Sequence, residues 1–418
     1  MAVRKKKIQN IKLVDFPEEV DEQNGIKVYG ETSWENQLAV LSQYLHNNVY
    51  IGDEDSKQEI IYAIREFLER KKSNKDEEIT DEYVIKVAEN PIAYNLFSDF
   101  FKVPFPNPKF GQHTFIDLFA GIGGIRLPFN EMGYRCVFSS EWDKYAQQTY
   151  LANFGEMPFG DITKEVTKKY IPKHFDLLLA GFPCQAFSIM GKMQGFADIR
   201  GTMFFEVATI LERHQPEAVL LENVKQLTTH DQGRTFSTIL RILGELGYHV
   251  KWQVLNALDF GLPQKRERVI IVGFRSQQRC DAFNFDFKKK TYNLKEILED
   301  DKDIDPSLFA SDMILQKRQK QTEGKNVFYP SIWHENKAGN VSVLDYACAL
   351  RTGASYNYLL VNGQRRLSSR ELLRLQGFPD NYKIAVSHGE IRRQTGNSVA
   401  VPMIREIARK IDYILNNI

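Results

Sequence analysis

Two stretches of the chain hold residues that can carry nucleophilic and acid–base chemistry. In the first, Cys184 follows Gly181-Phe-Pro, which itself follows an apolar run at residues 175–180. Because open α/β sheets place ligands at the carboxyl ends of their strands, a thiol at this point can meet a substrate. The turn beyond it can lower the thiol pKa from about 8.5, which favours the nucleophilic thiolate. The alternative is a buried structural cysteine, and the Gly-Phe-Pro loop argues against it.

The second stretch is Leu220-Leu-Glu-Asn-Val, where an apolar run again ends in polar residues. Partial burial there is expected to raise the pKa of Glu222 towards neutrality, so that its side chain can donate a proton. Arg266 and Arg268 stand two residues apart before another apolar run, which on an extended segment turns both to one face for binding phosphate or carboxylate. Taken alone, Glu222 also fits a helix cap, and the arginines fit a solvated charge run.

A third group of residues has the types that bind a nucleoside. The glycine-rich turn Phe-Ala-Gly-Ile-Gly-Gly at 119–124 lets a ligand approach the backbone at the end of a strand. Glu141 can accept hydrogen bonds from ribose hydroxyls, and Trp142 offers a face on which a base can stack. Gly160-Asp-Ile, at the end of a further strand, can meet an exocyclic amine. Taken alone, these residues also fit a plain glycine turn beside a surface Glu-Trp pair.

These residues need a scaffold that brings several strand ends together. Apolar runs predict strands at 114–119, 135–140, 175–180, 218–221 and 269–274, with helical stretches between them. This alternation is typical of a parallel sheet covered by helices. Residues 275–365 interrupt this alternation of strands and helices. Their polar, turn-rich sequence predicts an inserted second domain. Residues 396–418 then predict an amphipathic helix that returns to the sheet.

The beginning of the chain lacks this alternation of strands and helices. Residues 1–102 read as a small helical module, and the proline-rich stretch 103–108 reads as a stiff extended linker. The basic residues Arg4 to Lys7 can contact flanking DNA, although the module more simply braces the fold.

Composition excludes several classes of protein. The 418 residues carry a net charge of +1, so a nucleic acid would have to bind one local basic face. The four cysteines are widely spaced and form no CxxC pair, which argues against a disulfide framework or a cysteine-rich zinc site. No apolar run approaches the roughly 20 residues of a membrane helix. We therefore expect a cytoplasmic protein without metal.

The order and spacing of these motifs resemble the DNA (cytosine-5-)-methyltransferase family of bacterial restriction–modification systems. The matching positions are the 119–124 turn, Glu141-Trp142, Gly160-Asp-Ile, Gly-Phe-Pro-Cys-Gln, Glu-Asn-Val, Gln-Lys-Arg-Glu-Arg, Arg-Leu-Gln-Gly-Phe-Pro at 374–379 and Gly396-Asn-Ser-Val. The resemblance implies an α/β fold: a Rossmann-like S-adenosylmethionine-dependent methyltransferase sheet, with an inserted smaller target recognition domain and a helical N-terminal extension. The expected boundaries are 1–110 for the extension and linker, 111–280 for the catalytic domain, 281–370 for target recognition and 371–418 for the C-terminal return.

The resemblance also implies a role for each group of residues. Cys184 would attack carbon 6 of a flipped cytosine, and Glu222 would protonate ring nitrogen 3 with support from Arg268 and Arg266. Carbon 5 would then take a methyl group from S-adenosylmethionine, leaving S-adenosylhomocysteine, after which a base such as water would remove the carbon-5 proton and the cysteine would leave. The implied cofactor contacts are Phe119, Gly121, Ile122, Gly123, Glu141, Trp142, Asp161, Ile162, Gly181, Pro183, Asn397 and Ser398. The implied DNA contacts are Gln185, Ser188, Arg200 and Arg351.

One position departs from the family. Many members have Thr-Leu late in the target recognition domain, where this chain has Ala349-Leu350, and Arg351 can supply the missing phosphate contact.

The expected partner is double-stranded DNA, bound by a monomer, with a cognate restriction endonuclease acting independently. Two other functions remain open. A tRNA cytosine-5 methyltransferase is one alternative, although that branch has a second proline where this chain has Phe182. A non-catalytic DNA-binding regulator is the other, and the intact Cys184 and Glu222 argue against it.

Overall fold

The computed structural model describes residues 39, 103–108, 111–183 and 202–418. The helical module expected over 1–102 lies outside the described residues, apart from Ala39. The proline-rich stretch 103–108 forms no helix or strand, bends at residues 104–105 and packs against the body of the protein. The backbone N–H of Phe105 donates to the carbonyl of Asn153 at 3.0 Å, and the Asn107 side chain makes hydrogen bonds of 2.7 and 2.8 Å with the backbone of Cys136.

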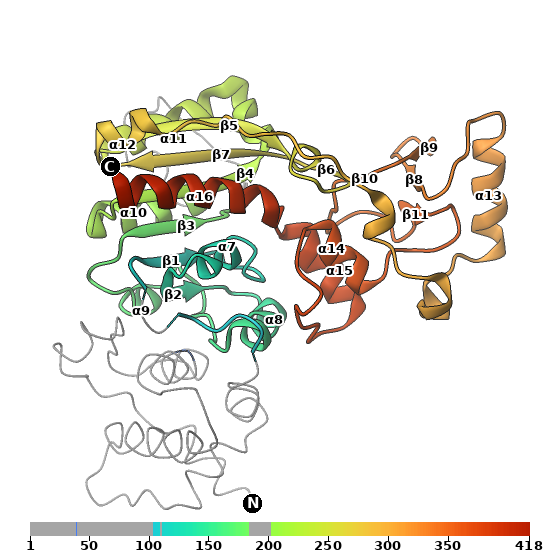
Figure 1. Cartoon of the computed structure of the whole chain (residues 1–418), viewed down its shortest axis with the longest axis horizontal. Helices are drawn as coiled ribbons and strands as arrows, with labels where there is room; N and C mark the ends of the chain where they lie inside the picture. The colour runs from blue at the N-terminus through green and yellow to red at the C-terminus, as the bar shows by residue number, and fades with distance from the viewer. Residues whose placement is uncertain (1–38, 40–102, 109–110, 184–201) are drawn as a thin grey trace, which may run out of the picture.

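A six-stranded sheet forms the centre of the described structure (Figure 1). Its strand order is β2-β1-β3-β4-β7-β5. The first four run parallel, whereas β7 pairs antiparallel with both β4 and β5. The strands are β1 (Thr114–Leu118), β2 (Arg135–Ser140), β3 (Leu177–Ala180), β4 (Ala218–Val224), β5 (His249–Asn256) and β7 (Glu267–Phe274).

The expected parallel sheet is antiparallel at one side, where the sequence did not reveal β5. Most of the β5 side chains are exposed or half-buried, so this edge strand lacks the continuous apolar run that marks the buried strands. The connection from Asn256 to Glu267 contains no crossover helix of the length that a parallel neighbour needs. The chain therefore reverses, and β7 returns antiparallel between β4 and β5.

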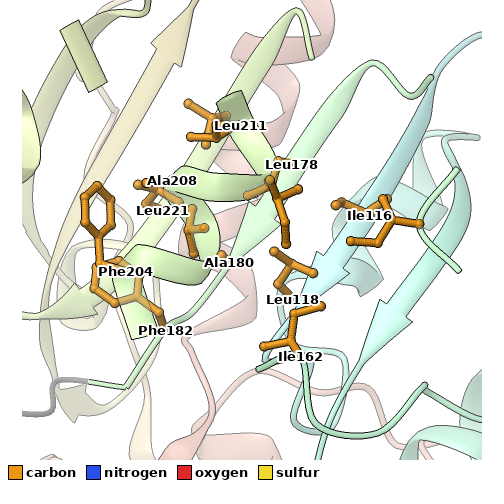
Figure 2. Packing of buried hydrophobic residues seen from close by; sticks show 14 of the residues in the cluster. Ile116, Leu118, Ile162, Leu178, Ala180, Phe182, Phe204, Ala208, Leu211 and Leu221 are labelled. Carbon is orange, nitrogen blue, oxygen red and sulfur yellow. The ribbon is translucent and has the colours of Figure 1, made fainter. Parts of the chain in front are cut away.

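Alternate side chains of the strands face two layers of helices. On one face, Ile116, Leu178 and Leu221 pack with α10 (Met203–His214) and α11 (Arg234–Glu245). Figure 2 shows this packing, including Phe182 against Phe204 at the carboxyl end of β3. On the other face, Phe115, Leu177 and Leu220 pack with α7 (Arg126–Glu131), α12 (Gln277–Ala282) and α16 (Val401–Asn417). Consecutive residues of each strand thus point to opposite sides, as the pleat of a strand requires.

The segment after β7 forms a smaller unit beside the carboxyl ends of the parallel strands (Figure 1). It contains α13 (Asp312–Thr322) and an antiparallel sheet of β8 (Ile332–Glu335), β9 (Val341–Leu344) and β11 (Leu359–Val361). Its own core is small, formed by Ala310, Trp333, Val341 and Leu360. A larger apolar cluster joins Leu350 and Leu359 of this unit to Ile122 and Tyr150 of the body.

The remaining elements connect the unit to the body. A two-stranded parallel ladder pairs β6 (Gln264–Lys265) with β10 (Ala347–Cys348). The helices α14 (Ser369–Leu375) and α15 (His388–Asn397) follow β11, whereas α8 (Lys144–Phe154) and α9 (Glu165–Lys168) follow β2. None of the described helices is long and apolar enough to span a bilayer.

Candidate nucleoside and base site

The glycine turn after β1 has the backbone geometry that its sequence predicts. Phe119, Gly121 and Gly123 all have positive φ, at 55°, 55° and 76°. A side chain at Gly123 would collide with a ring: its Cβ would lie 2.2 Å from Cε2 of Phe154. The turn therefore needs glycine for conformation and for space, and it leaves the main chain open at the end of β1. Ile122, another expected cofactor contact, is buried in the cluster that joins body and smaller unit.

Glu141 braces this turn from the end of β2. Its Oε2 accepts from the N–H of Gly121 at 2.8 Å, and its Oε1 accepts from the N–H of Asp143 at 2.8 Å. Burial raises the pKa of Glu141, and the two backbone hydrogen bonds oppose that rise. Each carboxylate oxygen has a second lone pair, so the side chain retains capacity to accept from a ligand hydroxyl. The neighbouring Trp142 is 78% exposed and leaves a ring face available for stacking.

Asp161 and Ile162 lie beside β2, but no strand precedes them. Phe159 makes only an isolated bridge to Ser140, so the strand expected before Gly160 is absent from the described residues there. The hydroxyl of Ser140 donates to the carbonyl of Gly160 at 2.7 Å, which fixes the turn. The Asp161 carboxylate accepts from the N–H and the hydroxyl of Thr163, and Ile162 is buried.

The segment that leads to the expected nucleophile is described up to Pro183. Phe182 is buried, and its carbonyl accepts from the Asn223 side chain at 2.8 Å. Pro183 is exposed. The loop is thus anchored in the core by one residue and directed outwards by the next. The expected nucleophile and three of the expected DNA contacts lie outside the described residues: Cys184, Gln185, Ser188 and Arg200.

Glu222 and Arg268 form an ion pair across β4 and β7. Glu222 pairs in register with Ile270, so Arg268, two residues away on β7, shares its face of the sheet. Nε of Arg268 lies 2.7 Å from Oε1 of Glu222, and both side chains are largely buried. Burial raises the pKa of Glu222, while the charges of Arg268 and Arg266 oppose the rise. Oε2 of Glu222 would lie 3.4 Å from a Cβ at Gly181, so the carboxylate stands beside the loop that leads to Cys184.

Arg266 has a different setting from Arg268. Its guanidinium donates to the carbonyls of Leu350 and Gly396, both at 3.1 Å, and to the carbonyl of Ser398. Burial, followed by the charge of Arg268, lowers its pKa to about 9, which still leaves it charged at neutral pH. Arg266 therefore binds main chain from the smaller unit and from the C-terminal segment. The i, i+2 spacing predicted that both arginines bind the same group. In the structure, Arg268 binds the carboxylate of Glu222, whereas Arg266 binds the three carbonyls.

The motif Gly396-Asn-Ser-Val, near the C-terminus, contacts the glycine turn at 119–124. A Cβ at Gly124 would lie 2.8 Å from the Ser398 hydroxyl, so the two segments are in direct contact. Asn397 is exposed at the end of α15, whereas Ser398 is buried. Arg351, the remaining expected DNA contact, borders this region, because the backbone N–H of Thr352 would lie 2.8 Å from a Cβ at Gly396.

Sequence reasoning missed the part played by Asn223. It recognised Glu-Asn as the polar end of a strand but gave the asparagine no task. Its side chain bonds the carbonyl of Phe182 and so links the end of β4 to the Gly-Phe-Pro loop. The signal was available, because a strand ending in two polar residues must satisfy the second as well as the first.

Together these groups can bind a nucleoside at the ends of β1 and β2 and hold a base at the ends of β3 and β4. The first half offers an open glycine turn, a buried carboxylate and an exposed indole. The second half offers a desolvated glutamate paired with arginine, beside a loop that leads to a cysteine. Among the residues that the structure describes, no group of histidine, cysteine and acidic side chains is arranged to hold a metal ion.

Comparisons with known proteins agree in fold and family. A model of the family "C-5 cytosine-specific DNA methylase" matches residues 113–413. The type II methyltransferase M.NgoBI of Neisseria gonorrhoeae is 58% identical over 301 residues, covering 72% of this chain and 93% of that protein. The type II methyltransferase M.HaeII of Haemophilus aegyptius is 56% identical, covering 73% and 94%. Among solved structures, the S. pombe Dnmt2 methyltransferase is similar with a TM-score of 0.54 at 19% identity, covering 73% of this chain and all of that one.

Proposed function

The chain belongs to the C-5 cytosine-specific DNA methylase family, and from that membership we infer that it transfers a methyl group to carbon 5 of cytosine within a specific sequence of double-stranded DNA. The similarity to type II methyltransferases makes it the modification component of a restriction–modification system. It would protect cytoplasmic DNA from a cognate restriction endonuclease that acts independently. The observation that carries this proposal is the Glu222–Arg268 pair beside the Gly-Phe-Pro-Cys loop.

S-adenosylmethionine is the methyl donor that the site fits. Glu141, buried but with lone pairs to spare, would accept from the ribose, and Trp142 would stack on the adenine. The positive-φ turn at 119–124 would pass close to the ligand, because Gly121 has no side chain to hold it off. When bound, this cofactor supplies an electrophilic methyl group and leaves as S-adenosylhomocysteine.

The chain's own residues would make the cytosine reactive. Carbon 5 of cytosine is a poor nucleophile until a thiolate adds to carbon 6, which we assign to Cys184. As the carbon–sulfur bond forms, negative charge develops on the ring, and Glu222 would give its proton to ring nitrogen 3. Its raised pKa favours the protonated form that this step needs. Arg268 would then stabilise the carboxylate that remains.

The domain roles follow from this assignment. We propose that residues 281–370 recognise the target sequence and that the catalytic domain is built from 111–280 and 371–418. A base must leave the helix to reach Glu222, because that side chain is buried at the strand ends. A monomer would suffice, since body and smaller unit already lie on two sides of the site.

One experiment tests the proposal directly. Methyl transfer from labelled S-adenosylmethionine is measured on a mixed-sequence duplex and, in parallel, on tRNA, with sequencing of the modified cytosines. We expect one short DNA motif to be methylated and tRNA to remain unlabelled. Label in tRNA alone would overturn the DNA assignment, and label in neither would favour a regulator.

The nucleophile is tested with one variant and a matched control. Cys184→Ser should lose methyl transfer while retaining DNA and S-adenosylhomocysteine binding, because only the thiolate is removed. Cys348→Ser, which alters a half-buried cysteine of β10, should keep its activity. A duplex carrying 5-fluorocytosine should trap a covalent complex with the parent protein and not with Cys184→Ser. Turnover by Cys184→Ser would contradict the assignment.

A further inference from the structure

A shallow hollow lies where the smaller unit meets α14 and α15. Its polar lining consists of Arg351, Arg366, Arg392, Tyr356, Tyr358 and His388, and we call it the arginine pocket. None of the described residues that line it is acidic. Three guanidiniums around one hollow therefore face no carboxylate from its walls.

The pocket arginines differ from their neighbours in how their charge is balanced. Within the described part of the chain, no ion pair involves Arg351, Arg366 or Arg392. Three nearby arginines are paired by contrast: Arg365 with Glu371 at 2.9 Å, Arg374 with Asp380 at 2.7 Å and Arg393 with Asp143 at 2.7 Å. The three pocket arginines thus have no carboxylate partner among the described residues, which leaves their charge available to an external anion.

The three arginines are held in place by aromatic rings and carbonyls. Tyr356, 45% exposed, contacts both Arg366 and Arg392, whose guanidinium carbons are 4.6 and 4.9 Å from its ring centroid. Arg351 lies over the ring of Tyr358 at 5.2 Å. Arg392 also donates to the carbonyls of Ala354 and Ser355. A guanidinium has five N–H donors, so Arg392 keeps others for a ligand.

His388 lies close enough to the pocket arginines for their positive charge to affect its pKa. Burial lowers the pKa of His388, and the charges of Arg392 and Arg366 lower it further, against a smaller opposite effect of Asp305. Its Nδ1 lies 3.0 Å from the hydroxyl of Ser369. A neutral imidazole at this position adds no charge, so the three arginines set the anion affinity.

The pocket is connected to the base site by a short path. The carbonyl of Leu350, next to Arg351, accepts from Arg266 at 3.1 Å. Arg268 follows two residues later, about 7 Å further along an extended segment, and reaches Glu222. Arg351 and Glu222 therefore lie at the two ends of one continuous series of contacts through Arg266 and Arg268.

We propose that the arginine pocket binds one backbone phosphate of the DNA, within a few nucleotides of the target cytosine. This inference rests on the proposed function, and it assigns Tyr356, Arg366 and Arg392 to DNA binding together with Arg351. Arginine suits a phosphodiester because its planar fork donates two parallel hydrogen bonds to phosphate oxygens. Such a contact reads no base, and it fixes the position of the duplex on the protein.

The test uses neutral phosphates and one charge-removing variant. The full chain, with S-adenosylhomocysteine, is titrated with duplexes that contain its methylated motif and one methylphosphonate at each position in turn. We expect one position near the target to weaken binding about tenfold, the size of a hydrogen bond to a charged group. Arg351→Gln should bind the unmodified duplex about tenfold more weakly and lose sensitivity at that same position. Arg351 is suitable because its side chain makes no hydrogen bond or ion pair with other described residues.

Arg409→Gln is the matched control, since it removes an equal charge from α16, where Arg409 pairs with Glu406. It should keep the parent's sensitivity pattern. The salt dependence gives a second readout: the slope of log affinity against log salt should fall by about 0.9 for Arg351→Gln and stay unchanged for Arg409→Gln.

Three outcomes would overturn the inference. One is a flat scan, and another is a sensitive position that persists in Arg351→Gln. The third is protection of the protein by inorganic phosphate together with a flat scan, which would assign the pocket to a free anion. Each is distinguishable from failure of the proposed function, because methylation of the unmodified duplex is measured on the same preparation.

Discussion

At the scale of the residue, the Glu222–Arg268 pair reconciles two opposite demands. A proton donor must hold its proton near neutral pH, and it must also release that proton to the ring. Burial favours the protonated glutamate, while Arg268 at 2.7 Å favours the carboxylate. In the proposed role of Glu222, these opposing influences would let it hold a proton before the base binds and release it when negative charge develops on the ring.

Trp142 allows a residue-scale prediction. Trp142→Ala should weaken S-adenosylhomocysteine binding by about 1–2 kcal/mol, because the indole would stack on the adenine. Titration calorimetry measures the change. Trp252→Ala is the control, since that tryptophan is also exposed, at 44%, but lies on edge strand β5. Equal S-adenosylhomocysteine affinities in the two variants would show that Trp142 does not contact the cofactor.

At the scale of the element, the turn after β1 depends on space as well as on backbone conformation. Gly123 and Gly133 both have positive φ, at 76° and 82°. Only Gly123 is also confined, because a Cβ there would meet the ring of Phe154, whereas nothing lies within 4 Å of a Cβ at Gly133. A side chain at Gly133 would therefore meet only conformational strain, whereas one at Gly123 would meet both strain and a collision.

Substituting alanine at each glycine tests this difference. Gly133→Ala should lower the free energy of unfolding by about 1 kcal/mol, the cost of placing a side chain at positive φ. Gly123→Ala should lower it by about 2–4 kcal/mol, because overpacking adds to the strain. It should also weaken S-adenosylhomocysteine binding, which Gly133→Ala should not. Urea denaturation and calorimetry give both values, and equal losses in the two variants would show that the collision is relieved cheaply.

The same scale shows what sequence could predict. Strands β1 to β4 and β7 were recognisable because each is buried on both faces and so reads as an apolar run. Strand β5 was not, because an edge strand with exposed side chains resembles a surface loop. The ends of strands located Glu141 and Glu222, since residue order fixes which side chain follows each strand. The sequence indicated that the Asn223 side chain needs a partner, but the partners of Arg266 and Asn223, Leu350 and Phe182, could not be predicted, because they are distant in sequence.

At the scale of the whole molecule, the smaller unit depends on the body for its position. Its own core holds four fully buried apolar side chains, whereas a larger cluster and Arg266 connect it to the body. Arg266 is buried and bonds carbonyls of both parts. This residue therefore helps to fix the orientation of the smaller unit relative to Glu222 and Arg268.

Arg266→Met tests that coupling. The change keeps an unbranched side chain but leaves buried carbonyls without a donor, each costing about 1–3 kcal/mol. We expect a lower melting temperature and a large loss of DNA affinity, with S-adenosylhomocysteine affinity nearly unchanged. Arg405→Met is the control, because Arg405 pairs with Glu131 on the surface. Parallel losses of DNA and cofactor affinity would indicate general unfolding instead of lost coupling.

The covering of the sheet by α16 has a consequence for the newly made chain. One face of β1, β3 and β4 packs against α16, which begins at Val401, whereas β1 begins at Thr114. At about 5–20 residues per second, a ribosome makes α16 roughly 15–60 s after β1. During that interval Phe115, Leu177 and Leu220 lack the part of their cover that α16 supplies. The nascent protein thus presents an apolar surface long before it can act, so its yield in the cell would depend on chaperones and on the rate of translation.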